Sequence, residues 1–391
     1  MAVYRPGAGC TLLTPDVDRA SWEASAPRSG PVLPPLTAAQ RATPWPLGEG
    51  APEPLHAGSA QAQALQQVSD ALFDEPATDP KTRQNTLAVL VVKDGRLVHE
   101  RYAQGYGPGM PLLGWSMTKT VTALWAGVAL GEGLLALDDA LPVPAWQGSH
   151  RPPVRWRDAL QMASGVDWFE GHAGFSDVSN MVFGQPDEGA FVEAKPMAAT
   201  PGTRFNYATG DSALLARSLK RVLGDDAQRA HDHQVASLFT PLGMRGAFVE
   251  ADVAGTPSGG SRAVLRPRDW LKLGQLILQD GQWQGVQRIP ASYIRFMRTP
   301  SPANPGYGGQ LWLHQPADMP PGMPTDVAYF SGLMGQYVVM VPSQKLIVLR
   351  MGVSFDKDET RRRVFQATQR LSRAFSEPER GLASLGDRLR R

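Results

Sequence analysis

The sequence predicts an α+β fold, in which helices flank an antiparallel sheet and a mostly helical segment is inserted into the chain. Two apolar, β-rich runs come early, at 86–92 and 97–102, and two more come late, at 336–341 and 345–351. The chain between them carries apolar residues at helical spacing and loops rich in glycine and proline. We therefore expect strands from both ends of the chain to share one sheet.

The first 80 residues (1–80) are expected to form an N-terminal extension and a first helix. Up to about residue 55 the chain is rich in Pro, Gly, Ala and Ser, which predicts an extended arm across the surface, held in part by Trp45. Ser59 is suited to cap the helix that follows, because Leu65, Val68 and Leu72 repeat at helical spacing.

Residues 81–135 and 240–391 are expected to form an α/β domain, with 136–239 as a helical subdomain between them. A tight turn at Lys93-Asp94-Gly95 makes the early strands a hairpin, and Pro342-Ser343 joins the late ones. The predicted helices run from Ser116 to about Leu130, over 154–162 and 211–223 in the subdomain, and over 268–278 and 359–375 after it.

Composition excludes several classes of function. The 39 basic and 37 acidic residues nearly cancel to a formal charge of +2, so no nucleic-acid partner is expected. No run of about 18 apolar residues predicts a membrane span. Cys10 is the single cysteine, which argues against an intrachain disulfide and a thiolate metal cluster. The first 15 residues do not resemble a signal peptide, so we expect the cytoplasm for the chain as written, and the periplasm if the start is truncated.

Ser116 and Lys119 lie three residues apart where the most apolar helix begins. Side chains at this spacing share one helix face. A serine needs a base to become a nucleophile, and burial lowers the pKa of a lysine enough to make it that base. The unpaired N–H groups at a helix start also suit a developing oxyanion. The alternative is a serine that caps the helix and a lysine that extends towards solvent.

A second Ser-x-x-Lys copy occupies 354–357. It leads into Asp358, Glu359 and three arginines, a solvated stretch in which a lysine would keep its charge. We therefore expect Ser354 and Lys357 to have no catalytic role.

Five blocks of residues follow one another between about 85 and 375. They are Gly114-Trp115-Ser116-Met117-Thr118-Lys119 with the later run 131–139, Leu160-Gln161-Met162-Ala163-Ser164-Gly165, Pro201 to Asp211, Gly259-Gly260-Ser261-Arg262 through Leu271, and Phe330-Ser331-Gly332 through Val339. In this order they resemble the serine β-lactamase and penicillin-binding-protein family, which includes class C β-lactamases, DD-peptidases and related esterases. The resemblance implies a β-lactamase/transpeptidase-like fold.

Carried over residue by residue, the resemblance implies an acyl-enzyme on Ser116, with Lys119 as proton acceptor and Tyr207 as general base and acid towards the leaving group. A phenolate beside a buried ammonium would have a lowered pKa. Backbone N–H groups of Ser116 and Leu333 would form the oxyanion hole. Neither a metal nor a cofactor is implied. Substrate contacts are expected from Thr209, Trp168, Ser331 and Gly332.

Two positions depart from the β-lactamase pattern. Thr209 stands where β-lactamases carry an asparagine, and Phe330-Ser331-Gly332 lacks the lysine that helps to bind a substrate carboxylate. We therefore expect poor turnover of β-lactams. The pair Gly335-Gln336 and the segment 307–312 favour the 6-aminohexanoate-dimer hydrolases and related esterases, hence a small ester or amide as substrate.

Two alternatives stay open, and so does the oligomeric state. One is a DD-peptidase or β-lactamase, and the other is a non-catalytic protein of the same fold that binds peptidoglycan or a small ligand. The run His231-Asp232-His233 is expected to be a solvated helix start, because no third metal ligand follows at a recognisable spacing. The absence of Gly-x-Ser-x-Gly disfavours a Ser-His-Asp hydrolase. One or two tryptophans are expected at the pocket, from the set Trp45, Trp146, Trp156, Trp168 and Trp312.

Overall fold

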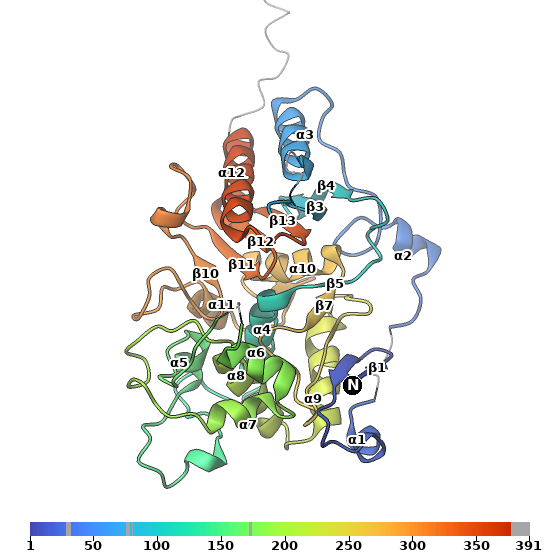
Figure 1. The fold of residues 1–391 in the computed structure, drawn as a ribbon. Helices are drawn as coiled ribbons and strands as arrows, with labels where there is room; N and C mark the ends of the chain where they lie inside the picture. Colours follow the sequence, from blue (N-terminus) through green and yellow to red (C-terminus); the bar gives the residue numbers. More distant parts are fainter. Residues whose placement is uncertain (29–32, 76–78, 80, 172–173, 377–391) are drawn as a thin grey trace, which may run out of the picture.

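The computed structural model describes residues 1–28, 33–75, 79, 81–171 and 174–376. Figure 1 shows a sheet covered by helices in the upper part of the molecule and a mainly helical region below it. The predicted α+β fold, with an antiparallel sheet flanked by helices, is confirmed. None of the helices in these ranges is long and apolar enough to cross a membrane.

The main sheet joins strands from both ends of the chain. β3 (Thr86–Lys93) and β4 (Arg96–Tyr102) form the predicted hairpin, and β13 (Leu346–Gly352) pairs with β3. The strand order is β10-β11-β12-β13-β3-β4, and every neighbouring pair is antiparallel. The other three strands are β10 (Trp312–Leu313), β11 (Ala328–Gly332) and β12 (Gln336–Val341).

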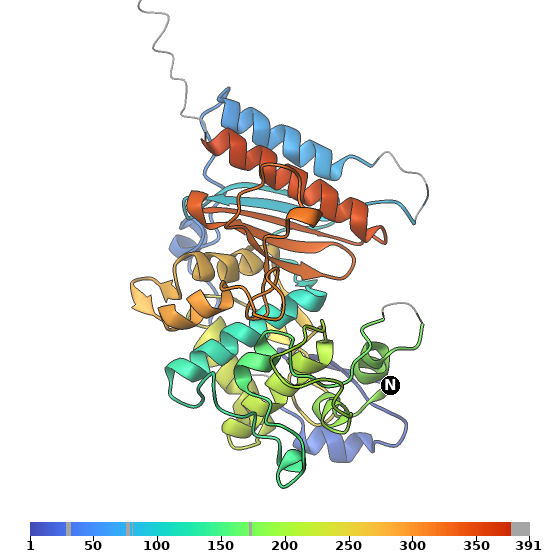
Figure 2. The same ribbon diagram turned by 90° about the vertical axis from the view of Figure 1, so that its left-hand side faces the viewer.

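Helices cover both faces of this sheet, which is why its central strands are apolar on both sides. α3 (Ala60–Phe73) and α12 (Lys357–Ser376) lie side by side above one face (Figure 2) and share a core cluster with Val89 and Val91. The alternate residues of β3, such as Leu90, point into the larger cluster on the other face, where α10 (Pro267–Leu278) packs.

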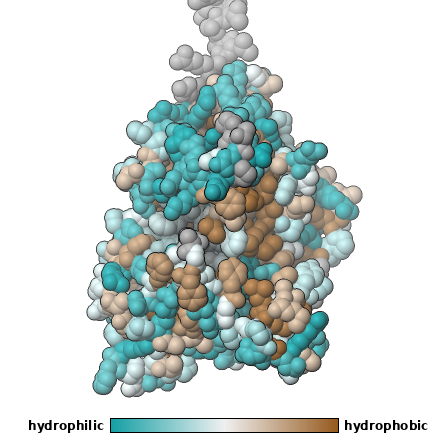
Figure 3. Space-filling view, viewed as in Figure 1, coloured by the Kyte–Doolittle hydropathy of each residue, from teal (hydrophilic) through white to brown (hydrophobic). Residues whose placement is uncertain are grey.

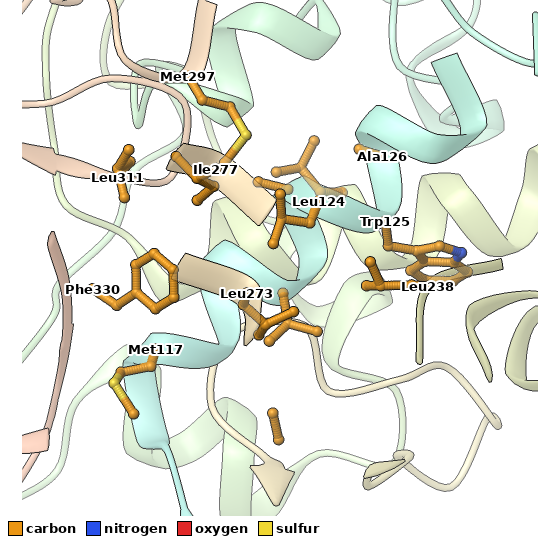
Figure 4. Close-up of a cluster of buried hydrophobic side chains, with 14 of the residues drawn as sticks. Met117, Leu124, Trp125, Ala126, Leu238, Leu273, Ile277, Met297, Leu311 and Phe330 are labelled. Carbon is orange, nitrogen blue, oxygen red and sulfur yellow. The ribbon is translucent and has the colours of Figure 1, made fainter. Parts of the chain in front are cut away.

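α4 (Thr118–Gly131) runs through the centre of the molecule and carries Lys119 in its first turn. It follows a short 3₁₀ turn, Trp115–Met117, and all its residues from Thr118 to Ala129 are buried. Figure 4 shows Leu124 and Trp125 among side chains from other elements, including Leu273 and Ile277 of α10. A helix that is surrounded on all sides is a rigid support for a side chain at its start.

The helical region is built from short helices, as predicted, but their bounds differ from the prediction. The helix expected over 154–162 spans only α5 (Trp156–Leu160), because Met162 has a φ of +57° and Val154 is extended against Leu141. The helix expected over 211–223 is α8 (Thr209–Val222). The others are α6 (Asp177–Gly184), α7 (Glu188–Glu193), α9 (Ala227–Gln234) and the π-helical turn Val235–Phe239.

The interpretation of His231 and His233 as a solvated helix start is wrong. Both lie in the last turn of α9, and His231 is buried. The indole N–H of Trp125 donates to Nδ1 of His233 at 2.8 Å, while Nε2 of His233 lies 2.7 Å from Glu132. His233 thus ties α9 to the end of α4, a contact that local sequence does not reveal.

The N-terminal segment forms more regular structure than the predicted extended arm. It contains β1 (Ala2–Arg5), β2 (Gly9–Leu12), α1 (Arg19–Ser25) and α2 (Ala38–Ala42). The hairpin docks on the body, because Cys10 N–H donates to Glu250 at 2.8 Å and Thr11 donates to the Ala251 carbonyl at 2.9 Å. Trp45 is buried and donates to the Arg268 carbonyl at 3.1 Å, so the expected anchor is confirmed.

Smaller elements complete the described fold. A three-stranded sheet has the order β5-β7-β6 and pairs the segment before Ser116 with the chain around residue 264. The remaining strands and α-helix are β5 (Leu112–Leu113), β6 (Phe248–Val249), β7 (Ala263–Leu265), β8 (Gln282–Trp283), β9 (Val286–Gln287) and α11 (Ala291–Met297). Three further 3₁₀ turns span Pro144–Trp146, Pro316–Asp318 and Pro342–Gln344.

Candidate active site

Ser116 lies on the sharp turn that leads into α4. Trp115 directly before it has a φ of +49°, a conformation that is uncommon and strained for a bulky side chain. A Cβ on Gly114 would lie 2.1 Å from the ring of Trp270, so only glycine fits there. The turn leaves Ser116 half-buried, at a point where two cavities meet.

Lys119 is buried beside Ser116, as the sequence predicted. Its side chain is 2% exposed, and Nζ donates to Ser116 Oγ at 3.0 Å, to Thr209 Oγ1 at 2.9 Å and to the Gly260 carbonyl at 3.0 Å. Burial lowers the lysine pKa to about 8, against the opposing charges of Glu170 and Glu188. Part of the population is therefore a neutral amine near pH 7, able to accept a proton.

The Gly259-Gly260 pair brings a carbonyl oxygen within reach of this lysine. A Cβ on Gly260 would lie 2.5 Å from Cγ2 of Thr209, and one on Gly259 would lie 2.7 Å from the Ser212 carbonyl. Because only glycine allows so close an approach to α8, the pair accounts for the fourth block of the sequence pattern.

Tyr207 lies against the same two groups, but its expected lowered pKa is wrong. Its phenol is hydrogen-bonded with Ser116, and its ring centroid is 5.0 Å from Nζ of Lys119. The ring stacks on Trp312 at a centroid distance of 5.2 Å. Loss of solvation and the charge of Glu170 raise the pKa of Tyr207, so the side chain is a neutral phenol near pH 7 rather than a phenolate.

The end of β11 meets the turn that carries Ser116. A Cβ on Gly332 would lie 2.2 Å from the Gly114 carbonyl, so this glycine allows the two segments to touch. Leu333 follows, and it lines both cavities together with Ser116. From behind, Gln336 donates to the Leu333 carbonyl at 3.1 Å and Arg350 donates to the Gly335 carbonyl at 2.8 Å.

A narrow cavity and a wide cavity open on either side of Ser116. The narrow one has about 100 Å³ and is mostly apolar, with one carboxylate, Glu170. The wide one has about 510 Å³ and is lined by aromatic rings and charged side chains. The narrow cavity is lined by Trp115, Val178, Val182, Phe183 and Thr209, among others. The wide one is lined by Tyr207, Trp312, Tyr329, Ser331, Gly332, Asp318, Lys357, Asp358 and Arg361, among others.

Apolar side chains extend beyond the narrow cavity to the surface. Phe169, Phe175 and Phe183 are 63%, 85% and 62% exposed, which is unusual for large apolar residues. Figure 3 shows apolar side chains gathered across the middle of one face, below a hydrophilic upper end where α3 and α12 lie.

The four residues that were expected to contact the substrate lie in different places relative to the two cavities. Ser331 and Gly332 line the wide cavity, and the Ser331 hydroxyl is hydrogen-bonded with the phenol of Tyr337. Thr209 lines the narrow cavity and contacts Lys119. Trp168 is buried and lines neither cavity, and its indole N–H donates to Glu170. Of the five tryptophans considered for the pocket, Trp312 lines the wide cavity.

Two residues of the site were missed from the sequence. Trp115 lines the narrow cavity, and its place next to Ser116 is the sequence signal that could have found it. Glu170 lies in the same cavity and hydrogen-bonds Thr209 through both the backbone and the hydroxyl. No periodicity or motif marks this glutamate, because it stands in a loop and meets Thr209 only through the fold.

No group of three or more His, Cys, Asp or Glu side chains in the described ranges is arranged to hold a metal ion. The β-lactamase family model matches residues 62–370, so this chain belongs to the β-lactamase family, whose members are serine hydrolases. None of the curated proteins matches the chain.

Solved structures of the same fold come from several kinds of protein. One from Bacillus anthracis, assigned as a 6-aminohexanoate-dimer hydrolase, has 18% identity and a TM-score of 0.62 over 75% of this chain and 80% of its own. EstCE1, a hydrolase with promiscuous acyltransferase activity, has 17% identity and a TM-score of 0.63, covering 79% and 98%. A penicillin-binding protein from Bacillus halodurans has 16% identity and a TM-score of 0.58, covering 76% and 97%. At such identities the likeness shows the fold alone.

Proposed function

We propose that this protein hydrolyses small carboxylic esters or amides through an acyl-enzyme on Ser116. The observation that carries the proposal is the 3.0 Å contact between Ser116 Oγ and the amine of Lys119, which burial holds at a pKa of about 8. A protein that only binds a ligand gains nothing from burying an amine against a hydroxyl, which costs desolvation energy.

The reaction proceeds in two acyl transfers. As Ser116 Oγ bonds to the substrate carbonyl carbon, its proton moves to Nζ of Lys119, and the carbonyl π electrons become an oxyanion. The N–H groups of Ser116 and Leu333 stabilise that oxyanion. Tyr207 is a neutral phenol that is hydrogen-bonded with Ser116. It passes a proton to the departing oxygen or nitrogen and is reprotonated from Lys119. Water then repeats the attack on the acyl carbon and releases the acid, without a cofactor.

The two cavities divide the substrate. Tyr207 lines the wide cavity, so the leaving group that it protonates lies there. The acyl group then occupies the narrow, apolar cavity. Two cations, Lys357 and Arg361, and two carboxylates, Asp318 and Asp358, line the wide cavity, so their formal charges cancel. This balance favours an uncharged leaving group over the carboxylate of a β-lactam or a peptide.

A panel of p-nitrophenyl esters of rising acyl length, run beside short amides and β-lactams, tests this proposal. We expect the largest kcat/KM for short acyl chains, and Ser116→Ala should abolish every activity. Rapid nitrocefin turnover that is lost in Ser116→Ala would instead establish a β-lactamase. A chain that never reacts with a fluorophosphonate probe would favour the ligand-binding alternative.

A further inference from the structure

Glu170 stands in the loop before α6 and belongs to none of the sequence blocks. Its carboxylate accepts a hydrogen bond from Thr209 N–H at 2.8 Å and another from the Thr209 hydroxyl. The indole N–H of Trp168 donates to the same carboxylate. The carboxylate therefore uses both oxygens to hold one residue, Thr209, whose hydroxyl touches the catalytic lysine.

The hydrogen bonds of Lys119 can be counted. An ammonium has three donors, and Nζ has three acceptors around it: Ser116 Oγ, Thr209 Oγ1 and the Gly260 carbonyl. The neutral amine, which is the form that acts as a base, has two donors and one lone pair. That lone pair needs a neighbour with a hydrogen to give.

Only one of the three neighbours can supply that hydrogen. The Gly260 carbonyl has none. The Thr209 hydroxyl has one, and it is already donated to Glu170. That leaves the Ser116 hydroxyl, which can donate into the lone pair while it accepts a hydrogen bond from the neutral phenol of Tyr207.

We propose that Glu170, acting through the Thr209 hydroxyl, is a positioning residue that directs the lone pair of neutral Lys119 at Ser116. Without the carboxylate, Thr209 could turn its hydrogen towards Nζ and occupy the lone pair itself. The Ser116 hydroxyl would then lose its base in that fraction of molecules, although each group would remain in the site. This inference rests on the proposed function, because it concerns the same proton transfer.

The negative charge of Glu170 also changes the pKa of Lys119, an effect that an uncharged residue with the same hydrogen bonds would lack. The charged groups acting on Lys119 are Glu170 and Glu188, and both favour its protonated form. Glu188 is itself hydrogen-bonded by Ser258 at 2.7 Å and lies 3.6 Å from Arg262, so Glu170 is the carboxylate that connects to Nζ through a single hydroxyl. Neutralising Glu170 should lower the lysine pKa further.

Glu170→Gln tests the inference, with Thr209→Val and Thr209→Ser as partners. We expect Glu170→Gln to lower kcat/KM for a p-nitrophenyl ester by about 10- to 100-fold, part of the factor that a base contributes. The pH below which kcat/KM falls (the acidic limb of the pH profile) should also be lower in this variant than in the wild type. Thr209→Val removes the acceptor that holds one N–H of the amine, which could then turn towards Ser116, so it should lose a similar factor. Thr209→Ser, which keeps the hydroxyl, should stay within a few-fold of the wild type. Because Glu170 acts through Thr209, the double variant Glu170→Gln/Thr209→Val should be no slower than Thr209→Val alone.

Thermal unfolding of each variant provides the control for folding, and Thr209→Ser allows the test to be read even if Thr209→Val is unstable. A folded Glu170→Gln variant with the wild-type rate and an unmoved acidic limb would overturn the inference, as would losses that add in the double variant. These outcomes are separate from the failure of the proposed function, in which the wild type itself would neither hydrolyse esters nor react with the fluorophosphonate probe.

Discussion

The chain contains the spacing Ser-x-x-Lys twice, and the two copies have opposite surroundings. Lys119 is 2% exposed and lies 3.0 Å from Ser116, whereas Lys357 is exposed at the first residue of α12. Ser354 is buried, but it accepts a hydrogen bond from Arg350 at 2.7 Å and donates to the Gln84 carbonyl. The same four-residue spacing therefore brings a serine and a buried lysine together in one place and supports a buried arginine in the other.

Sequence spacing therefore brings two side chains close together, but their surroundings decide their chemistry. Ser116 and Lys119 fall in successive turns of one buried helix start, while Ser354 precedes its helix. A lysine becomes a base only where burial removes the water that stabilises its charge. Substitutions in both copies can therefore test whether burial makes the difference between them.

The largest effect on activity is expected from Ser116→Ala, with Ser354→Ala as the matching variant of the second copy. Removing a covalent nucleophile should lower ester hydrolysis by at least about 10⁴-fold and abolish fluorophosphonate labelling. Labelling of Ser354→Ala should persist, and peptide mapping should find the label on Ser116. A label on Ser354 would mean that the second Ser-x-x-Lys copy, and not the first, carries the nucleophile.

The second largest loss of activity is expected from Lys119→Met and Lys119→Arg. Removal of a general base costs about 10²- to 10⁴-fold, and we expect both variants to lose this factor in the rate of fluorophosphonate labelling. Arginine keeps the positive charge but does not give up its proton, so it separates the need for a base from the need for a cation. Recovery of the rate in Lys119→Arg would show that the charge alone is required.

The pH profile should show a smaller effect, about tenfold per pH unit. In the proposed reaction the active form of Lys119 is unprotonated, and burial lowers its pKa to about 8. The kcat/KM for an uncharged ester should therefore fall with slope one as the pH drops below about 8, and level off above it. A profile that stays flat down to pH 6 would contradict a lysine base.

The smallest effect concerns stability. Ser354→Ala removes one acceptor from the buried guanidinium of Arg350, which keeps its bond to the Gly335 carbonyl. We expect the free energy of unfolding in urea to fall by about 1–3 kcal/mol. Ser343→Ala, at an exposed position, is the matched control and should change it by less than about 0.5 kcal/mol. Equal values for the two variants would mean that Ser354 contributes no support.

Much of the fold could be predicted from local patterns. The hairpin of β3 and β4, the cap at Ser59 and the long helix after Ser116 follow from turn chemistry and apolar spacing. The predictions failed where a distant partner decides. Met162 ends α5 early with a left-handed backbone, and His231 is buried although its neighbours are charged. The N-terminal hairpin is stabilised by Glu250 and Ala251, more than 200 residues away along the chain.

The sequence was sufficient to identify Ser116 and Lys119 and the order of the blocks around them, because neighbours on one helix turn are close in any fold that keeps the helix. It could not reveal that Glu170 binds Thr209, nor the direction of the Tyr207 pKa shift. Both depend on which groups lose water and which charges they face once loops from separate parts of the chain pack together. Solvation and charge act through space, so these properties arise only in the assembled protein.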